Sequence, residues 1–131
     1  MSQENEYVAY RKEEADKLSK LFFILHTKYP IDKNKIVFST FEGDGGFCCN
    51  PRYIAEEIHR SNPDYDMVWL THNKNAVFPD YIRVVDDTQE NAAYELATAK
   101  VWVDNYRKPF GTIKRPGQYY IQTWHASIGF K

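Results

Sequence analysis

The sequence predicts an α/β domain of the Rossmann-like, doubly wound type, with a mostly parallel five-stranded sheet preceded by an amphipathic N-terminal helix. Three observations favour this class. Five short apolar runs recur along the chain, and several are apolar without interruption, as in parallel strands that are covered on both faces. Helical patterns lie between some of the runs, which predicts right-handed crossovers. A chain of 131 residues, 43% of them hydrophobic, is long enough to bury one core.

The first expected element is a helix from residue 6 to residue 29. Apolar side chains recur there at the spacings of one helical face, while the other face mixes acidic and basic side chains. Pro30 ends the helix. We expect residues 1–34 to form a helix and linker that pack on a domain of residues 35–131. The apolar positions of the helix are Val8, Ala15, Leu18, Phe22, Leu25 and Tyr29.

Two further helices are expected between the strands. Asn50 is the expected N-cap of the first, with Pro51 at its first helical position. Asp87 and Glu90 have the spacing of a capping box, which predicts a second helix that runs to Lys100. The expected strands are Ile36–Ser39, Met67–Leu70, Ile82–Val85, Val101–Val103 and Tyr119–Gln122.

Composition excludes several classes of function. Lys and Arg number 17 against 18 for Asp and Glu, so the net charge of -1 supplies no basic field for nucleic acid. The only cysteines, Cys48 and Cys49, are adjacent and make neither a disulfide framework nor a zinc site. The acidic N-terminus lacks a signal sequence, and no stretch has the length of a membrane span. We expect a cytoplasmic domain that binds no metal or other cofactor.

Candidate site residues follow the carboxyl ends of the strands, where ligands bind in open parallel sheets. Three loops, residues 40–46, 104–105 and 123–127, are expected to face one crevice. The first is rich in glycine but lacks the third glycine of a dinucleotide fingerprint. Glu42 and Gly43 there are either substrate contacts or turn residues, and we interpret Asp44 as part of the turn.

His125 is the candidate general base. It directly follows an apolar strand and is flanked by small residues, so its backbone is held by a rigid element while its side chain is open to substrate. Its position alone leaves a structural or capping role as the alternative. The other histidines, His26, His59 and His72, fall in a helix, near a helix end and in a surface turn, and we expect structural roles for them.

The loop before the last strand is locally basic. It contains Arg107, Lys108, Lys114 and Arg115, which either hold a phosphate-bearing ligand at the crevice or are solvated loop charges. The residues alone leave both interpretations open.

Several of these pieces together resemble the CDP-glycerol glycerophosphotransferase family, the teichoic acid polymerases and primases of Gram-positive bacteria. The resemblance covers residues 35 to 131 and rests on the order and spacing of its pieces. They are Glu42-Gly43 after the first strand, Asn50-Pro51-Arg52-Tyr53-Ile54, Val68-Trp69-Leu70, the run from Ala97 to Asn105, and Gln118 to His125, which ends in Gln-Thr-Trp-His.

The resemblance implies a GT-B-like enzyme of two Rossmann-type domains, of which this chain is the first and the donor-binding domain is absent. It implies that His125 deprotonates an acceptor hydroxyl for attack on the donor's β-phosphate, with release of CMP. By itself this fragment is then expected to be inactive. Together with the loops at the crevice, the resemblance predicts substrate contacts at Glu42, Gly43, Asn105, Arg107, Lys114, Arg115, Thr123 and Ser127.

The implied partners are a CDP-glycerol or other CDP-polyol donor and a lipid-linked glycerophosphate or saccharide acceptor. Membrane contact is then peripheral, at the cytoplasmic face. The run Ala126 to Lys131 departs from the family's commonest pattern after the histidine, which leaves the donor polyol open. Two alternatives remain. They are a GT-B glycosyltransferase for capsular polysaccharide, which donor screening distinguishes, and a non-enzymatic Rossmann-like binding module, which a stop codon after Lys131 favours.

Overall fold

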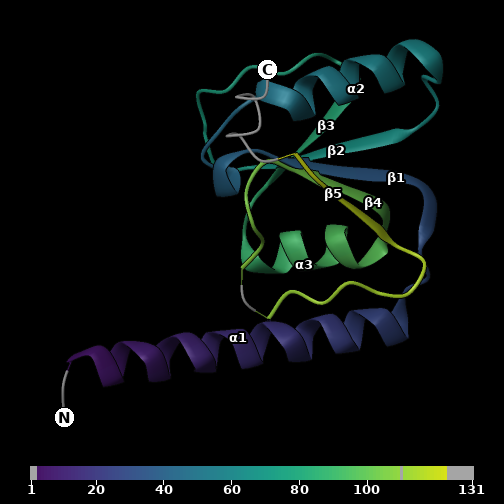
Figure 1. The fold of residues 1–131 in the computed structure, drawn as a ribbon. Helices are drawn as coiled ribbons and strands as arrows, with labels where there is room; N and C mark the ends of the chain where they lie inside the picture. Colours follow the sequence, from purple (N-terminus) through teal and green to yellow (C-terminus); the bar gives the residue numbers. More distant parts are fainter. Residues whose placement is uncertain (1–2, 110, 124–131) are drawn as a thin grey trace.

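Five parallel strands form one sheet with helices on both faces (Figure 1). The computed structural model describes residues 3–109 and 111–123. Every pairing in the strand order β3-β2-β1-β4-β5 is parallel, which confirms the predicted fold class. The elements are α1 (Gln3–Lys28), β1 (Asp32–Ser39), the 3-10 turn η1 (Phe41–Gly43), α2 (Cys49–Ser61), β2 (Asp66–Thr71), β3 (Ile82–Asp86), α3 (Gln89–Thr98), β4 (Ala99–Asp104) and β5 (Tyr119–Gln122).

Alternating side chains of the strands build two cores. On one face, Val37 and Trp102 pack with Leu18 and Phe22 of α1 and with residues of α3. Figure 1 shows α3 between the sheet and α1. On the other face, beneath α2, the rings of Phe38 and Trp69 stack with centroids 5.1 Å apart. Because both faces are covered, the central strands are apolar without interruption, as the sequence pattern predicted.

Helix boundaries differ from the predictions in detail. Helix α2 begins at Cys49, and its N-cap is the extended Cys48, not Asn50. Helix α3 is capped by Thr88, whose hydroxyl accepts a hydrogen bond of 3.1 Å from the Asn91 amide, so the predicted capping box at Asp87 is wrong. The helix ends at Thr98 because Ala99 is already extended, and β4 begins there.

No helix among residues 3–109 and 111–123 combines the length and the apolar character that crossing a bilayer requires.

Candidate functional site

The carboxyl ends of the strands form one edge of the sheet, and a cavity of about 260 Å³ lies beside it. Its walls come from α1, α3, the strand ends, residues 107–109 and Thr112. The strand order reverses between β1 and β4, and ligands bind at such switch points in open α/β sheets. Apolar side chains of the core form the floor, and the rim is polar. The rim residues are Glu42, His72, Asp87, Asp104, Arg107 and Lys108.

A strained turn follows β1 at this edge. Phe41, Glu42 and Gly43 have φ angles of 50°, 56° and 89°, a backbone region that residues other than glycine seldom adopt. The Gly43 carbonyl accepts hydrogen bonds from the His72 amide at 2.9 Å and the Thr71 hydroxyl at 3.1 Å. A Cβ at Gly43 would lie 2.2 Å from the Asp87 carboxylate, so glycine is strongly favoured there. Gly43 of the turn therefore lies against the ends of β2 and β3.

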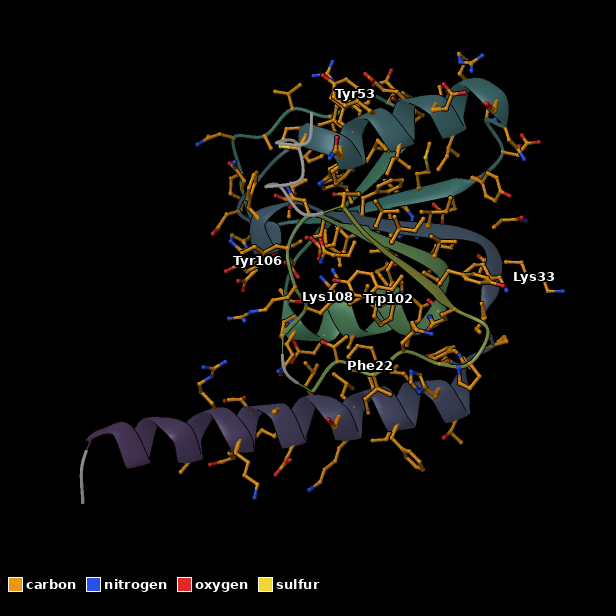
Figure 2. The ribbon with its side chains drawn as sticks, viewed as in Figure 1. Phe22, Lys33, Tyr53, Trp102, Tyr106 and Lys108 are labelled. Atoms are coloured by element: carbon orange, nitrogen blue, oxygen red, sulfur yellow. The ribbon has the colours of Figure 1, made fainter. Side chains whose placement is uncertain are left out.

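Asp104 and Lys108 form a buried ion pair at the end of β4. Lys108 Nζ lies 2.8 Å from Asp104 Oδ2, and the two side chains are 11% and 1% exposed. Figure 2 labels Lys108 between the sheet and α1, with Phe22 rising from α1 on the same side. Burial raises the pKa of Asp104, while the Lys108 ammonium opposes that rise. Tyr106 donates its backbone N–H to the other carboxylate oxygen at 3.0 Å.

Two more ionisable groups line the rim. Burial raises the pKa of Asp87, and the charges of Lys108 and His72 oppose the rise. His72 Nε2 pairs with Asp44 Oδ1 on the exposed side of the turn. A second hollow of about 540 Å³ adjoins the cavity and shares Glu42 and His72 with it; Phe41, Asp44 and Tyr106 complete its lining.

Sequence reasoning passed over four of these residues. It interpreted His72 as structural, Asp44 as a turn residue and Asp87 as a helix cap, and it named Lys108 without choosing it as a contact. A signal was present for two of them, because His72 and Asp87 each directly follow the carboxyl end of a strand. Applied to every strand, that criterion finds both.

The predicted contacts Glu42, Gly43 and Arg107 lie at this edge, whereas Asn105 supports it from within. Asn105 is 0% exposed, and its side-chain oxygen accepts a hydrogen bond of 2.9 Å from the Phe41 amide. Its Nδ2 is buried without a hydrogen-bond partner in the described part of the chain. Asn105 therefore positions the strained turn.

Lys114 and Arg115 lie at the opposite edge of the sheet, contrary to the expectation that the basic loop residues share one crevice. Because β5 is parallel to β4, the segment between them must return to the amino edge before β5 begins. Lys114 Nζ donates to the Gln118 carbonyl at 3.0 Å, next to the first residue of β5. The Arg115 guanidinium donates to the carbonyls of Tyr29 at 2.7 Å, Ala97 at 3.2 Å and His26 at 3.3 Å.

Thr123 is the last described residue, and it lies at the carboxyl edge. Its amide and its hydroxyl both donate to the Asp104 carbonyl, at 2.8 Å and 3.1 Å. The predicted base His125 and the predicted contact Ser127 lie outside the described residues. Within residues 3–109 and 111–123, no group of three or more His, Cys, Asp or Glu side chains is arranged to hold a metal ion.

The fold and the site define a Rossmann-like α/β domain with a cavity at the carboxyl edge of a parallel sheet, where ligands bind in such domains. The model of one family, "CDP-Glycerol:Poly(glycerophosphate) glycerophosphotransferase", matches residues 21–131. The chain belongs to this family.

The sequence is similar to curated teichoic acid poly(glycerol phosphate) polymerases. It is 29% identical over 113 residues to the polymerase of Bacillus subtilis (strain 168), covering 85% of this chain and 15% of the relative. It is 34% identical over 94 residues to that of Staphylococcus epidermidis (strain RP62A), covering 70% of this chain and 13% of the relative. The chain thus spans a small part of each relative's length.

A solved structure of the wall teichoic acid polymerase TagF matches with a TM-score of 0.73 and 28% sequence identity, over 86% of this chain and 28% of the TagF chain. A variant of TagF soaked with CDPG matches the fold with the same TM-score, at 24% identity over 95% of this chain and 32% of that one. The likeness supports the GT-B-like, Rossmann-type architecture.

Proposed function

We propose that this chain is the acceptor-side domain of a glycerophosphotransferase that moves a polyol phosphate from a CDP-activated donor to an acceptor hydroxyl and releases CMP. Membership in the family supports the reaction class. The observation that supports this site is the convergence of Asp104, Lys108, Asp87 and the strained turn at the edge where Thr123 is bound. His125 follows Thr123 by two residues.

In the proposed reaction, His125 takes the proton of the acceptor hydroxyl. The hydroxyl oxygen attacks the β-phosphorus of the donor, and the bond from that phosphorus to the oxygen shared with CMP breaks, so CMP leaves with the electron pair. Histidine suits this task because it titrates near neutral pH. A second domain of the full-length protein holds most of the donor. The strained turn and the Asp104–Lys108 pair form part of the acceptor side.

The relatives' names support a place in teichoic acid synthesis, and the family's description supports CDP-glycerol as the donor. We propose further that the acceptor is a lipid-linked glycerophosphate or saccharide and that the enzyme works at the cytoplasmic face of the membrane without spanning it. Polyol-phosphate transfer is favoured over sugar transfer and over a binding role without catalysis, because the family match covers most of the chain.

The test is release of CMP from CDP-glycerol by the full-length protein. His125→Ala is expected to lower kcat about 10²- to 10⁴-fold, the loss typical for removal of a general base. His59→Ala serves as the control. His59 of α2 stacks on Tyr81 with ring centroids 3.8 Å apart, away from the site. Full activity of His125→Ala would disprove the base assignment. Turnover of a nucleotide sugar in place of CDP-glycerol would disprove polyol-phosphate transfer.

A further inference from the structure

The cavity beside the carboxyl edge has an apolar floor that the proposed chemistry does not use. Leu18 and Phe22 of α1 and Leu96 of α3 line it, and all three are at most 6% exposed. Its volume of about 260 Å³ is far above the roughly 15 Å³ that one water molecule needs. The space therefore accommodates a small organic group with both apolar and polar atoms.

The charges on the rim disfavour a phosphate inside the cavity. Lys108 is already paired with Asp104 at 2.8 Å, so its positive charge is offset within the protein. Glu42 and Asp87 add two further carboxyl groups to the lining. Arg107 and Glu42 are both exposed at the rim, where water and salt screen their charges, so the half-buried Asp87 is the main unpaired charge among the described residues of the lining. A phosphate placed here would meet carboxylates of like charge, an arrangement that costs binding energy.

The same rim suits hydroxyl groups. An ionised carboxylate accepts hydrogen bonds and donates none, so the hydroxyls of a ligand can donate to the half-buried Asp87 and to the exposed Glu42. The C–H groups of a polyol pack on an apolar floor such as the one that Phe22 and Leu96 form. Asp87 is half-buried in the cavity wall, and this burial raises the pKa of its carboxyl group.

We propose that this cavity binds the uncharged polyol end of the acceptor, with Asp87 and Glu42 accepting hydrogen bonds from its hydroxyls and the apolar floor packing against its carbon atoms. The acceptor's own phosphate then stays outside the cavity. That the bound polyol belongs to the acceptor rests on the proposed function, because a CDP-polyol donor also contains a polyol. The hydroxyl chemistry itself depends only on the cavity.

The test is saturation-transfer NMR of glycerol on the full-length protein, with glycerol as the probe. Asp87→Asn is expected to weaken glycerol binding about tenfold. Asp86→Asn is the matched control, since the neighbouring Asp86 undergoes the same change of charge but does not line the cavity. Thermal unfolding of both variants verifies that they are folded. Equal weakening by both variants, or no weakening by either, would overturn the proposal.

Two competition experiments identify the occupant. Inorganic phosphate at the same concentration as glycerol is expected to leave the glycerol signal in place, and displacement of glycerol by phosphate overturns the charge argument. Saturating CDP-glycerol is expected to leave the Asp87-dependent signal in place, and loss of that signal assigns the cavity to the donor and overturns the acceptor assignment. Release of CMP, measured on the same preparations, tests the proposed function separately.

Discussion

The two edges of the sheet use charged residues in different ways. At the amino edge, Lys35 Nζ bonds Glu95 at 2.8 Å, both side chains are at most 7% exposed, and Arg83 completes the group from β3. At the carboxyl edge, Asp87 and Asp104 have raised pKa values because burial outweighs the nearby cations. Burial would raise the pKa of Glu95 as well, but hydrogen bonds from Arg83 and Lys35 outweigh it and lower that pKa.

This contrast separates structural charges from candidate functional ones. Carboxylates at the amino edge are satisfied by protein donors, so they contribute to stability and offer little to a ligand. At the other edge, the buried Asp104 and the half-buried Asp87 lie beside a cavity and a strained turn, and such groups cluster at functional sites. The difference predicts that substitutions at the amino edge change stability and that those at the carboxyl edge change ligand binding.

The largest stability loss is expected for Lys35→Met, about 3 kcal/mol. Removing one partner of a buried ion pair leaves the charge of the other, here Glu95, less well compensated. Arg83 stays bonded to Glu95 at 3.0 Å and therefore limits the loss of stability. Urea unfolding measures it. The control is Lys17→Met, whose exposed pair with Glu13 spans 3.5 Å and is worth about 0.5 kcal/mol or less. Equal losses for both variants would contradict the structural role of the amino edge.

Arg115→Ala is expected to cost about 2 kcal/mol and to leave glycerol binding unchanged. The guanidinium bonds carbonyls near the C-terminal ends of α1 and α3, where a positive charge is favourable. Thermal unfolding and the saturation-transfer signal measure the two effects. A variant that keeps its stability but loses CMP release would restore the sequence-based prediction that Arg115 contacts substrate.

Gly43→Ala is expected to have a smaller effect on stability, about 1 to 2 kcal/mol, but to abolish glycerol binding. Its φ of +89° is strained for alanine, and the new Cβ must displace the Asp87 carboxylate. Gly117→Ala is the matched control, with φ +95° and a nearest contact of 3.6 Å, so it has the backbone strain without the clash. If both variants bind glycerol alike, the close approach of the turn to Asp87 has no part in the site.

Periodicity predicted the sheet because burial on both faces leaves a continuous apolar pattern, as at Val37 and Phe38. Helix ends were predicted less well, since the choice between Asp87 and Thr88 as the cap depends on backbone geometry. The clearest gap concerned His72, which looked like a turn residue. Its position directly after β2 was a signal in the sequence, and the pairing of β2 between β1 and β3 brings it to the rim.

By itself, the sequence determined the fold class, the family and the edge of the sheet at which the site is sought, because hydrophobic pattern and motif order are local properties of the chain. Tertiary structure alone decided which charges meet there. Lys108 and Arg115 stand in one basic loop, yet the parallel β5 requires that loop to cross from the carboxyl edge to the amino edge. Lys108 therefore pairs with Asp104 beside the cavity, while Arg115 binds the ends of two helices.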